Sequence, residues 1–198
     1  VILVQAALVI EPPDTPLVAC GGWDGLKLGR REPDGTWSPE MIRGHLRPVS
    51  LSMARDKDGG LHVAVVTEDG SLTYLIRGEA GWQDAWDGTL GVNHIDIAVD
   101  SYARAHFVSI TDYESVAEYY HYNDGAWLSD LITYDGADHL NKPAIATDAA
   151  GRAHVVLRVG DQVQHAVHDP AWPIDFKHGW DRDGLLDTVA EGVTGHPG

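Results

Sequence analysis

The stretch Ser50–Trp82, SLSMARDKDGGLHVAVVTEDGSLTYLIRGEAGW, decides the fold of this chain. It contains three short apolar runs separated by tight turns, an Asp-x-x-Gly turn that begins at Asp56 and an Asp-Gly turn at Asp69. Short apolar runs that are bounded by Gly and Asp indicate β-strands joined by turns. His62 lies at the start of the second run, and a Gly-Trp pair closes the stretch. The unit therefore predicts an antiparallel sheet.

The same unit recurs about four times along the chain. Four tryptophans stand 45 residues apart, at Trp37, Trp82, Trp127 and Trp172. Three of the repeats also place an Asp six residues before a His, in the pairs Asp56 and His62, Asp100 and His106, and Asp148 and His154. A period of about 45 residues with four strands in each repeat is typical of a β-propeller blade.

We therefore predict an all-β fold, a β-propeller of about four four-stranded antiparallel blades. A single domain is expected to cover residues 1–198, with blades at about 6–45, 46–91, 92–138 and 139–185, a possible closing strand at 1–5 and a tail at 186–198. The repeated Trp is expected to fill the wedge between neighbouring blades. The repeated His is expected to be held by a neighbouring backbone group or carboxylate.

Composition excludes several classes of partner. The chain of 198 residues has a net charge of −16 and a pI near 4.8, which argues against nucleic acids and anionic membranes as partners. No apolar run is long enough to insert into a membrane. The lone Cys20 excludes an internal disulfide and a zinc-thiolate cluster. We expect a secreted or cell-surface protein that needs no cofactor, that takes carbohydrate or a protein surface as partner, and for which an oligomer is possible.

Two motifs carry a family resemblance. The pattern D-x-x-G-x-x-H-V in Asp56–Val63 and Asp148–Val155 resembles bacterial sialidase-like propeller repeats. The fourth repeat is similar to propeller polysaccharide lyases, and the second resembles bacterial and fungal propeller lectins, which have one sugar site between each pair of blades. The resemblance implies a propeller fold and a carbohydrate-related function. The sialidase Asp-box is not present in clean form, which counts against a glycosidase.

The channel mouth of the predicted propeller is one expected binding site. In a propeller, the loops that enter each first strand and those that join the second and third strands share this face. Aromatic faces pack on sugar C–H groups, while Asp and His can hold the hydroxyls. The candidate ligand-binding residues on these loops are Trp23, Asp24, His45, Asp69, His94, Tyr113, His139 and Asp161.

Catalysis and a metal are the other readings of the polar residues. A lyase would need a base and a group that neutralises a uronate carboxylate, for which His139, Tyr120 and Arg152 are the candidates. Only 14 Lys and Arg residues are present, which makes a uronate cleft poor in cations. A calcium loop is the possible metal site, at Asp181, Asp183 and Asp187, although a simple Asp-Gly turn explains the same residues.

The sequence thus favours a noncatalytic, lectin-like module that binds carbohydrate through the channel mouth or the clefts between blades. A polysaccharide lyase or glycoside hydrolase of the sialidase-like propeller class is one alternative. A protein-interaction or assembly scaffold is another.

Overall fold

The computed structural model describes residues 5–88, 91–111, 116–123, 126–133, 142–159, 162–169 and 187–190, and these form four antiparallel sheets of four strands each. In every sheet the strands follow one another in chain order. The first sheet consists of β1 (Ala6–Glu11), β2 (Thr15–Gly22), β3 (Gly25–Arg31) and β4 (Trp37–Gly44). The second consists of β5 (Pro48–Arg55), β6 (Leu61–Thr67), β7 (Leu72–Gly78) and β8 (Gly81–Asp87). The third consists of β9 (Val92–Val99), β10 (Ala105–Thr111), β11 (Val116–Asn123) and β12 (Ala126–Thr133). The fourth consists of β13 (Ala144–Thr147), β14 (Ala153–Val159), β15 (Gln162–His168) and β16 (Asp187–Ala190).

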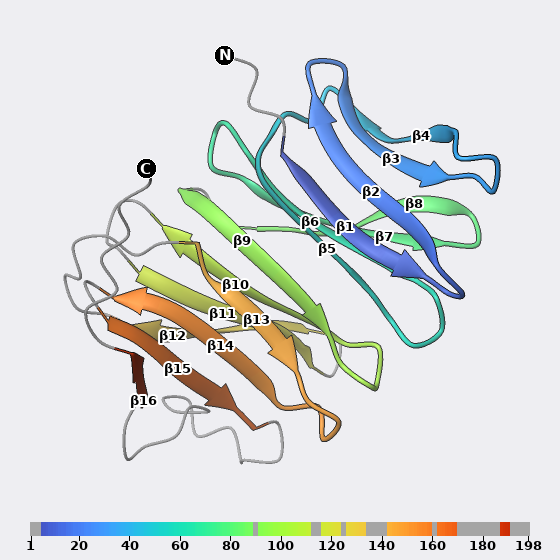
Figure 1. Cartoon of the computed structure of the whole chain (residues 1–198). Coiled ribbons are helices and arrows are strands. Elements are labelled where there is room, and N and C mark those ends of the chain that lie inside the picture. The colour runs from blue at the N-terminus through green and yellow to red at the C-terminus, as the bar shows by residue number, and fades with distance from the viewer. Residues whose placement is uncertain are drawn as a thin grey trace.

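The four sheets are arranged as a fan with their first strands on the inside (Figure 1). These first strands are neighbours, because β5 contacts both β1 and β9, and β9 contacts β13. The first and fourth sheets lie at the two ends of the fan. The described strands therefore form an open arc, and the predicted all-β architecture of four four-stranded antiparallel sheets is confirmed.

Apolar side chains fill the space between neighbouring sheets in three layers. The layer between the first and second sheets includes Leu17, Leu26, Leu28, Leu51, Val63 and Leu75. The layer between the second and third includes Ala64, Val66, Leu72, Tyr74, Ile95 and Phe107. The layer between the third and fourth includes Val108, Ala117, Tyr119, Val155, Leu157 and Ala166. The six residues Leu61–Val66 of β6 are all buried, because neighbouring sheets cover both faces of this strand.

Polar side chains link the inner strands to one another. Asp96 on β9 accepts a hydrogen bond from the Ser52 hydroxyl at 2.5 Å and another from the Ile145 backbone N–H at 2.9 Å. One carboxylate thus holds β5, β9 and β13 in place. The Ser50 hydroxyl oxygen also accepts a bond from the Ile95 N–H, at 3.2 Å. Inner strands of different sheets are joined by these side-chain bonds rather than by a backbone ladder.

The repeated Asp and His have the structural role that the sequence predicted. Asp56 accepts backbone N–H bonds from Asp58 and Gly60, at 2.9 and 2.7 Å, and thereby closes its turn. The other carboxylate oxygen lies 3.1 Å from His62 Nε2, and His62 Nδ1 lies 2.6 Å from the Tyr74 hydroxyl. The third and fourth sheets repeat this arrangement, with Asp–His distances of 3.2 and 3.4 Å.

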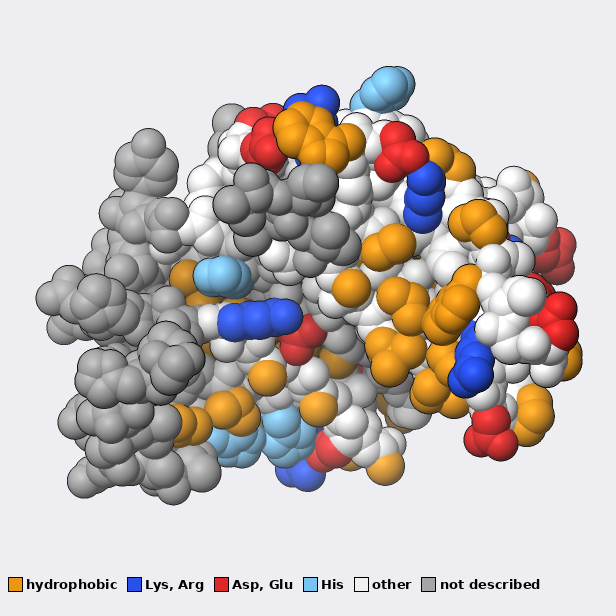
Figure 2. Space-filling model, turned by 45° about the horizontal axis from the view of Figure 1, so that its top comes forward, with side chains coloured by type: hydrophobic (Ala, Val, Ile, Leu, Met, Phe, Trp, Pro, Cys, Tyr) orange, Lys and Arg blue, Asp and Glu red, His pale blue; other side chains and the backbone are white. Residues whose placement is uncertain are grey.

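The prediction for the repeated Trp holds inside the arc and is wrong at its first position. Trp82 packs against the apolar layer between the first and second sheets, and Trp127 packs against the layer between the second and third. Trp37 is 51 % exposed, because no described sheet precedes the first one. It belongs to a group of exposed apolar side chains on the first sheet. Figure 2 shows a face of the molecule on which hydrophobic side chains gather. The members of this group are Leu8, Ile10, Trp37 and Met41. Trp172 lies outside the described residues.

The last strand of the fourth sheet lies beyond the expected end of the fourth blade. The fourth strand of the last sheet, β16, is formed by residues 187–190, which we expected in the tail. The order within this sheet requires an outer strand, and β16 pairs antiparallel with β15 to supply it. Of the possible closing strand, only Gln5 is described, and its carbonyl accepts the Gly21 N–H at 3.0 Å. Among the described residues, no helix has the length and apolar character of a membrane span.

Candidate ligand-binding clefts

Three of the residues predicted at the channel mouth lie together at one end of the first sheet. Trp23 and Asp24 form the turn between β2 and β3, and Trp23 is 65 % exposed, with the Arg47 guanidinium 4.8 Å from its ring centroid. The backbone carbonyl of Asp24 accepts the His45 N–H at 3.4 Å. The hydrogen bond from Lys27 lowers the pKa of the Asp24 carboxyl. This cluster is an exposed turn, and a cation already covers its aromatic face.

Two other predicted mouth residues, Asp69 and His94, are not part of this cluster. Asp69 accepts hydrogen bonds from the Thr67 hydroxyl at 2.5 Å and the Ser71 N–H at 3.2 Å, so it holds its own turn. His94 lies within β9, paired with Ile110, rather than in the loop that enters the strand. Tyr113, His139 and Asp161 lie outside the described residues.

Of the residues proposed for a lyase or a calcium site, the structure describes Tyr120, Arg152 and Asp187. Tyr120 is buried toward the second sheet, and its hydroxyl donates to Glu118. Arg152 donates to Asp148 at 2.6 Å, in the first turn of the fourth sheet. Asp187 is the first residue of β16, whereas Asp181 and Asp183 lie outside the described residues.

A different set of positions recurs in the clefts between neighbouring sheets. Tyr74 and Tyr119 each contact the repeated His of their own sheet, so they occupy equivalent positions. The residues paired with them on the fourth strands are Trp86 and Asp130. The first sheet has Glu40 at this place. Each of the three positions faces the following sheet.

Two further positions complete each cleft. The second residue after the tyrosine position lies on the same face as the tyrosine, because side chains alternate along a strand. These second residues are Arg30, Ile76 and His121. The third residue after the tyrosine position lies on the opposite face and points toward the preceding sheet. In each cleft, this residue therefore belongs to the later of the two sheets. These third residues are Arg77, Tyr122 and His168.

The cleft between the first and second sheets is charged and open. Glu40 accepts a hydrogen bond from Arg77 Nη2 at 2.7 Å with one oxygen and from the Trp82 indole N–H at 2.9 Å with the other. The side chains of Arg77 and Glu40 are 38 % and 40 % exposed, so a ligand can reach both. Arg30 pairs with Glu11 at 2.7 Å beside them. A cavity of about 100 Å³ lies here, lined by Leu17, Leu28, Arg30, Ser38, Pro39, Glu40 and Arg77.

The cleft between the second and third sheets is filled by aromatic rings. Trp86 stands where the first sheet has Glu40, and it stacks on Trp127 with centroids 5.2 Å apart. It also lies 6.2 Å from Phe107 and 5.4 Å from Tyr120. Tyr122 packs on Trp127 at 5.5 Å. Aromatic packing therefore replaces the polar groups here, and the cleft is closed.

The cleft between the third and fourth sheets contains two imidazoles and a carboxylate. His121, Asp130 and His168 each offer one donor atom, and these atoms lie within 4.8 Å of one another. Burial lowers the pKa of His121 and lowers that of His168 to about 3. Both imidazoles are therefore neutral at pH 7, the form in which histidine binds metals. Burial also lowers the pKa of the neighbouring His106, to about 4.

Sequence reasoning named the clefts between blades as a possible site but missed the residues that line them, because it explained the Trp series by packing alone. Trp82 packs, but its N–H also binds Glu40 of the preceding sheet. A signal was available in the repeats, since Arg77, Tyr122 and His168 stand at the same position of successive units and differ in chemistry. A position that varies from charged to aromatic within one protein is not required by the fold.

Solved structures resemble this chain in fold. A triple arginine-to-alanine mutant of AofleA from Arthrobotrys oligospora matches with a TM-score of 0.68 and 12 % identity, over 96 % of this chain and 57 % of that protein. A mutant of Aleuria aurantia lectin in complex with alpha-methyl-L-fucoside matches with a TM-score of 0.63 and 13 % identity, over 96 % of this chain and 65 % of the lectin. The fungal Aleuria aurantia lectin has a six-bladed β-propeller fold. The chain spans less than two thirds of the length of each of these proteins.

At such low identity the likeness establishes the fold alone. A gluconolactonase from Xanthomonas campestris, XC5397, also matches, with a TM-score of 0.56 and 13 % identity over 82 % of this chain and 57 % of the enzyme. Binding proteins and an enzyme thus share this architecture. No family model matches the chain, so the sialidase-like resemblance has no support from that comparison. No curated protein matches it either.

Proposed function

We propose that the four sheets are blades of a β-propeller and that the chain is a noncatalytic carbohydrate-binding module. Its sugar site is the cleft between the first and second sheets. The observation that carries this proposal is the position of Glu40, whose two oxygens are held by Arg77 and Trp82 at the edge of a cavity.

The polar groups of the cleft match the hydroxyl groups of a sugar. The Glu40 carboxylate accepts hydrogen bonds, and the guanidinium groups of Arg30 and Arg77 donate them. A sugar hydroxyl can do both, so neighbouring hydroxyls can bridge the carboxylate and a guanidinium. The ion pair with Arg77 and the indole N–H of Trp82 fix the carboxylate before a ligand arrives, which lowers the entropy cost of binding.

The apolar part of the cleft favours a deoxy sugar. Leu17, Leu28 and Pro39 line the cavity beside the charged groups. Such a surface accepts C–H and methyl groups but leaves a hydroxyl unpaired. A 6-deoxyhexose presents a methyl group where an ordinary hexose presents a hydroxyl. Support also comes from the Aleuria aurantia lectin, which has been solved with alpha-methyl-L-fucoside and with Fucalpha1-6GlcNAc.

Calorimetric titration of the full chain with methyl α-L-fucoside tests the proposal. We expect binding by the unchanged chain and an affinity loss of at least about tenfold in Glu40→Gln, because hydrogen bonds to a charged group contribute about 1.5–3 kcal/mol each. Asp84→Asn is the matched control, since Asp84 pairs with Arg43 between the same two sheets outside the cavity. It should bind as the unchanged chain does.

A further variant separates the cleft from the channel mouth. Trp23→Ala removes the exposed ring of the predicted mouth and should leave fucoside affinity unchanged. Loss of binding in Trp23→Ala together with full binding in Glu40→Gln would move the site to the mouth. If the folded chain binds neither the fucoside nor any glycan of an array, the carbohydrate proposal is wrong.

A further inference from the structure

We propose that the cleft between the third and fourth sheets is a binding site for a divalent transition metal of the zinc class, held by His121, Asp130 and His168. This cleft is separate from the proposed sugar site, and the inference does not depend on sugar binding. The three residues come from β11, β12 and β15, so a bound ion joins the two sheets.

The donor atoms are close to the separation that a metal requires. His168 Nε2 lies 3.9 Å from Asp130 Oδ2, and all three donor atoms lie within 4.8 Å of one another. Zinc bonds of about 2.0–2.1 Å in a tetrahedron place the ligand atoms about 3.4 Å apart. The site therefore needs an inward movement of about 1 Å, which rotation of the imidazole and carboxylate side chains can supply.

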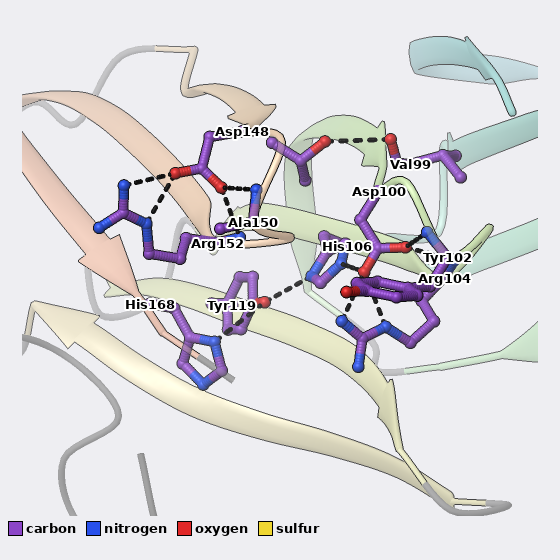
Figure 3. A network of polar contacts seen from close by, with 11 residues as sticks. Val99, Asp100, Tyr102, Arg104, His106, Tyr119, Asp148, Ala150, Arg152 and His168 are labelled. Carbon is purple, nitrogen blue, oxygen red and sulfur yellow. Dashed lines mark hydrogen bonds and ion pairs between the residues drawn. The ribbon is translucent and has the colours of Figure 1, made fainter. Parts of the chain in front are cut away.

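A chain of polar contacts favours one tautomer of His168 (Figure 3). Asp100 Oδ2 lies 3.2 Å from His106 Nε2 without an aligned hydrogen bond, and the negative charge of this carboxylate favours a proton on that nitrogen. His106 Nδ1 then accepts from the Tyr119 hydroxyl at 2.6 Å. The hydroxyl oxygen in turn accepts from His168 Nδ1 at 3.4 Å.

In this order of donors His168 Nε2 carries no proton, and it lies 3.9 Å from Asp130 Oδ2. Two acceptors thus face each other across the cleft, and a cation between them resolves the repulsion. Asp100, His106 and Tyr119 then orient the His168 imidazole through its Nδ1 atom. Metal-binding histidines commonly have their second nitrogen held in this way by a carboxylate or another polar group.

His121 provides the third ligand. Its ring lies 4.8 Å from that of His168, and its Nδ1 is buried with no hydrogen-bond partner among the described residues. A buried polar atom without a partner costs free energy, which a metal bond removes. Two imidazoles and one carboxylate suit zinc, whereas calcium selects oxygen ligands. Three protein ligands leave one coordination position for water.

Comparison with the cleft between the second and third sheets indicates that these polar residues form a metal site and are not needed for packing. The positions of His121, Asp130 and His168 are taken by Ile76, Trp86 and Tyr122 one sheet earlier. That set closes its cleft with apolar contacts and shows that the fold does not need polar groups there. The third and fourth sheets instead bury ionisable groups, which is costly unless a partner compensates them.

The test is calorimetric titration of the full chain with zinc after removal of metals by a chelator. We expect one ion per chain and a rise in the thermal unfolding midpoint, since a ligand that binds only the folded state stabilises it. His168→Asn and Asp130→Asn should each lose at least about tenfold in affinity, as loss of metal-site groups typically does. His45→Asn is the matched control, because His45 lies in an exposed turn of the first sheet, and it should bind zinc like the unchanged chain.

A cobalt titration of the unchanged chain keeps the proposal testable if a variant fails to fold. Four-coordinate cobalt bound by nitrogen and oxygen gives intense visible absorption bands, and zinc should displace them. The proposal is overturned if the folded chain shows neither zinc binding nor these bands. It is equally overturned if His168→Asn and Asp130→Asn fold and bind zinc as tightly as His45→Asn does.

Discussion

Glu40 and Asp130 occupy equivalent positions on the fourth strands of the first and third sheets, and each faces the sheet that follows. Their partners differ, since Glu40 binds Arg77 and Trp82 while Asp130 lies beside His168. The repeat unit thus supplies one geometry to every cleft, and the side chains at a few positions decide its chemistry. Substitutions at these positions should change binding, whereas substitutions at positions that maintain the fold should change stability.

Trp82→Phe should weaken sugar binding more than it weakens folding. The ring still packs between the first two sheets, but the N–H bond to Glu40 is lost. We expect a several-fold loss of fucoside affinity and a fall of about 1 kcal/mol or less in the free energy of unfolding. Calorimetry and urea unfolding measure the two effects. Trp37→Phe is the control, and an equal loss of affinity in both variants would contradict the role of the indole N–H.

Trp86→Ala should destabilise the protein far more than Trp37→Ala. Trp86 stacks on Phe107 and Trp127 and packs at a tilt against Tyr120, so truncation leaves a cavity in the cleft between the second and third sheets. We expect a loss of about 3 kcal/mol for this change. Trp37 is 51 % exposed and should cost less than about 1 kcal/mol. Urea unfolding of both variants gives the comparison, and similar losses would mean that Trp37 is covered in solution.

Stability should fall as the pH is lowered from about 6.5 to about 4. Burial lowers the pKa of His106 from 6.5 to about 4, so in this range the unfolded chain takes up a proton that the folded chain does not. The folded state therefore loses stability as the pH falls, by about 2 kcal/mol for this one group between pH 7.5 and 5. His121 and His168 shift in the same direction. Urea unfolding at a series of pH values in the presence of a chelator measures the slope. His106→Asn should show a shallower slope, and an unchanged slope would contradict this assignment.

Asp96→Ala should loosen the inner strands. The carboxylate accepts bonds from Ser52 and from the Ile145 N–H, which belong to different sheets. Its removal leaves the buried Ser52 hydroxyl and a backbone N–H without this partner, at a cost of about 2–3 kcal/mol. Asp34→Ala is the control, because Asp34 binds only Thr36 in an exposed turn and should cost about 1 kcal/mol or less. Hydrogen exchange of β9 and β13 should increase in Asp96→Ala and not in the control.

The sequence was sufficient to predict the strands and the turn modules because these depend on local spacing. Asp56 and His62 lie six residues apart, and a hairpin of that length brings them together whatever surrounds it. The nearly continuous apolar runs of β6 and β10 likewise follow from strands that are buried on both faces. The outer strand β16 was missed because the sequence after Trp172 does not match the repeat cleanly.

The residues that meet in the clefts could not be predicted in the same way. Glu40 and Arg77 are 37 positions apart, and His121 and His168 are 47 apart, so no local pattern connects either pair. Their proximity depends on the angle at which one sheet packs against the next, which the sequence of a single unit does not specify. The predicted mouth residues were chosen by loop position, but Asp69 is committed to its turn and His94 lies within a strand.

Sequence alone therefore determined the repeat, the four-stranded unit and the residues that close its turns, since each of these is fixed by contacts between neighbouring strands. Tertiary structure decided which polar residues meet. The packing of successive sheets brings the fourth strand of one unit against the third strand of the next, and so places Glu40 beside Arg77 and Asp130 beside His168. The chemistry of the protein lies at these junctions between units, where residues of separate repeats share one cleft.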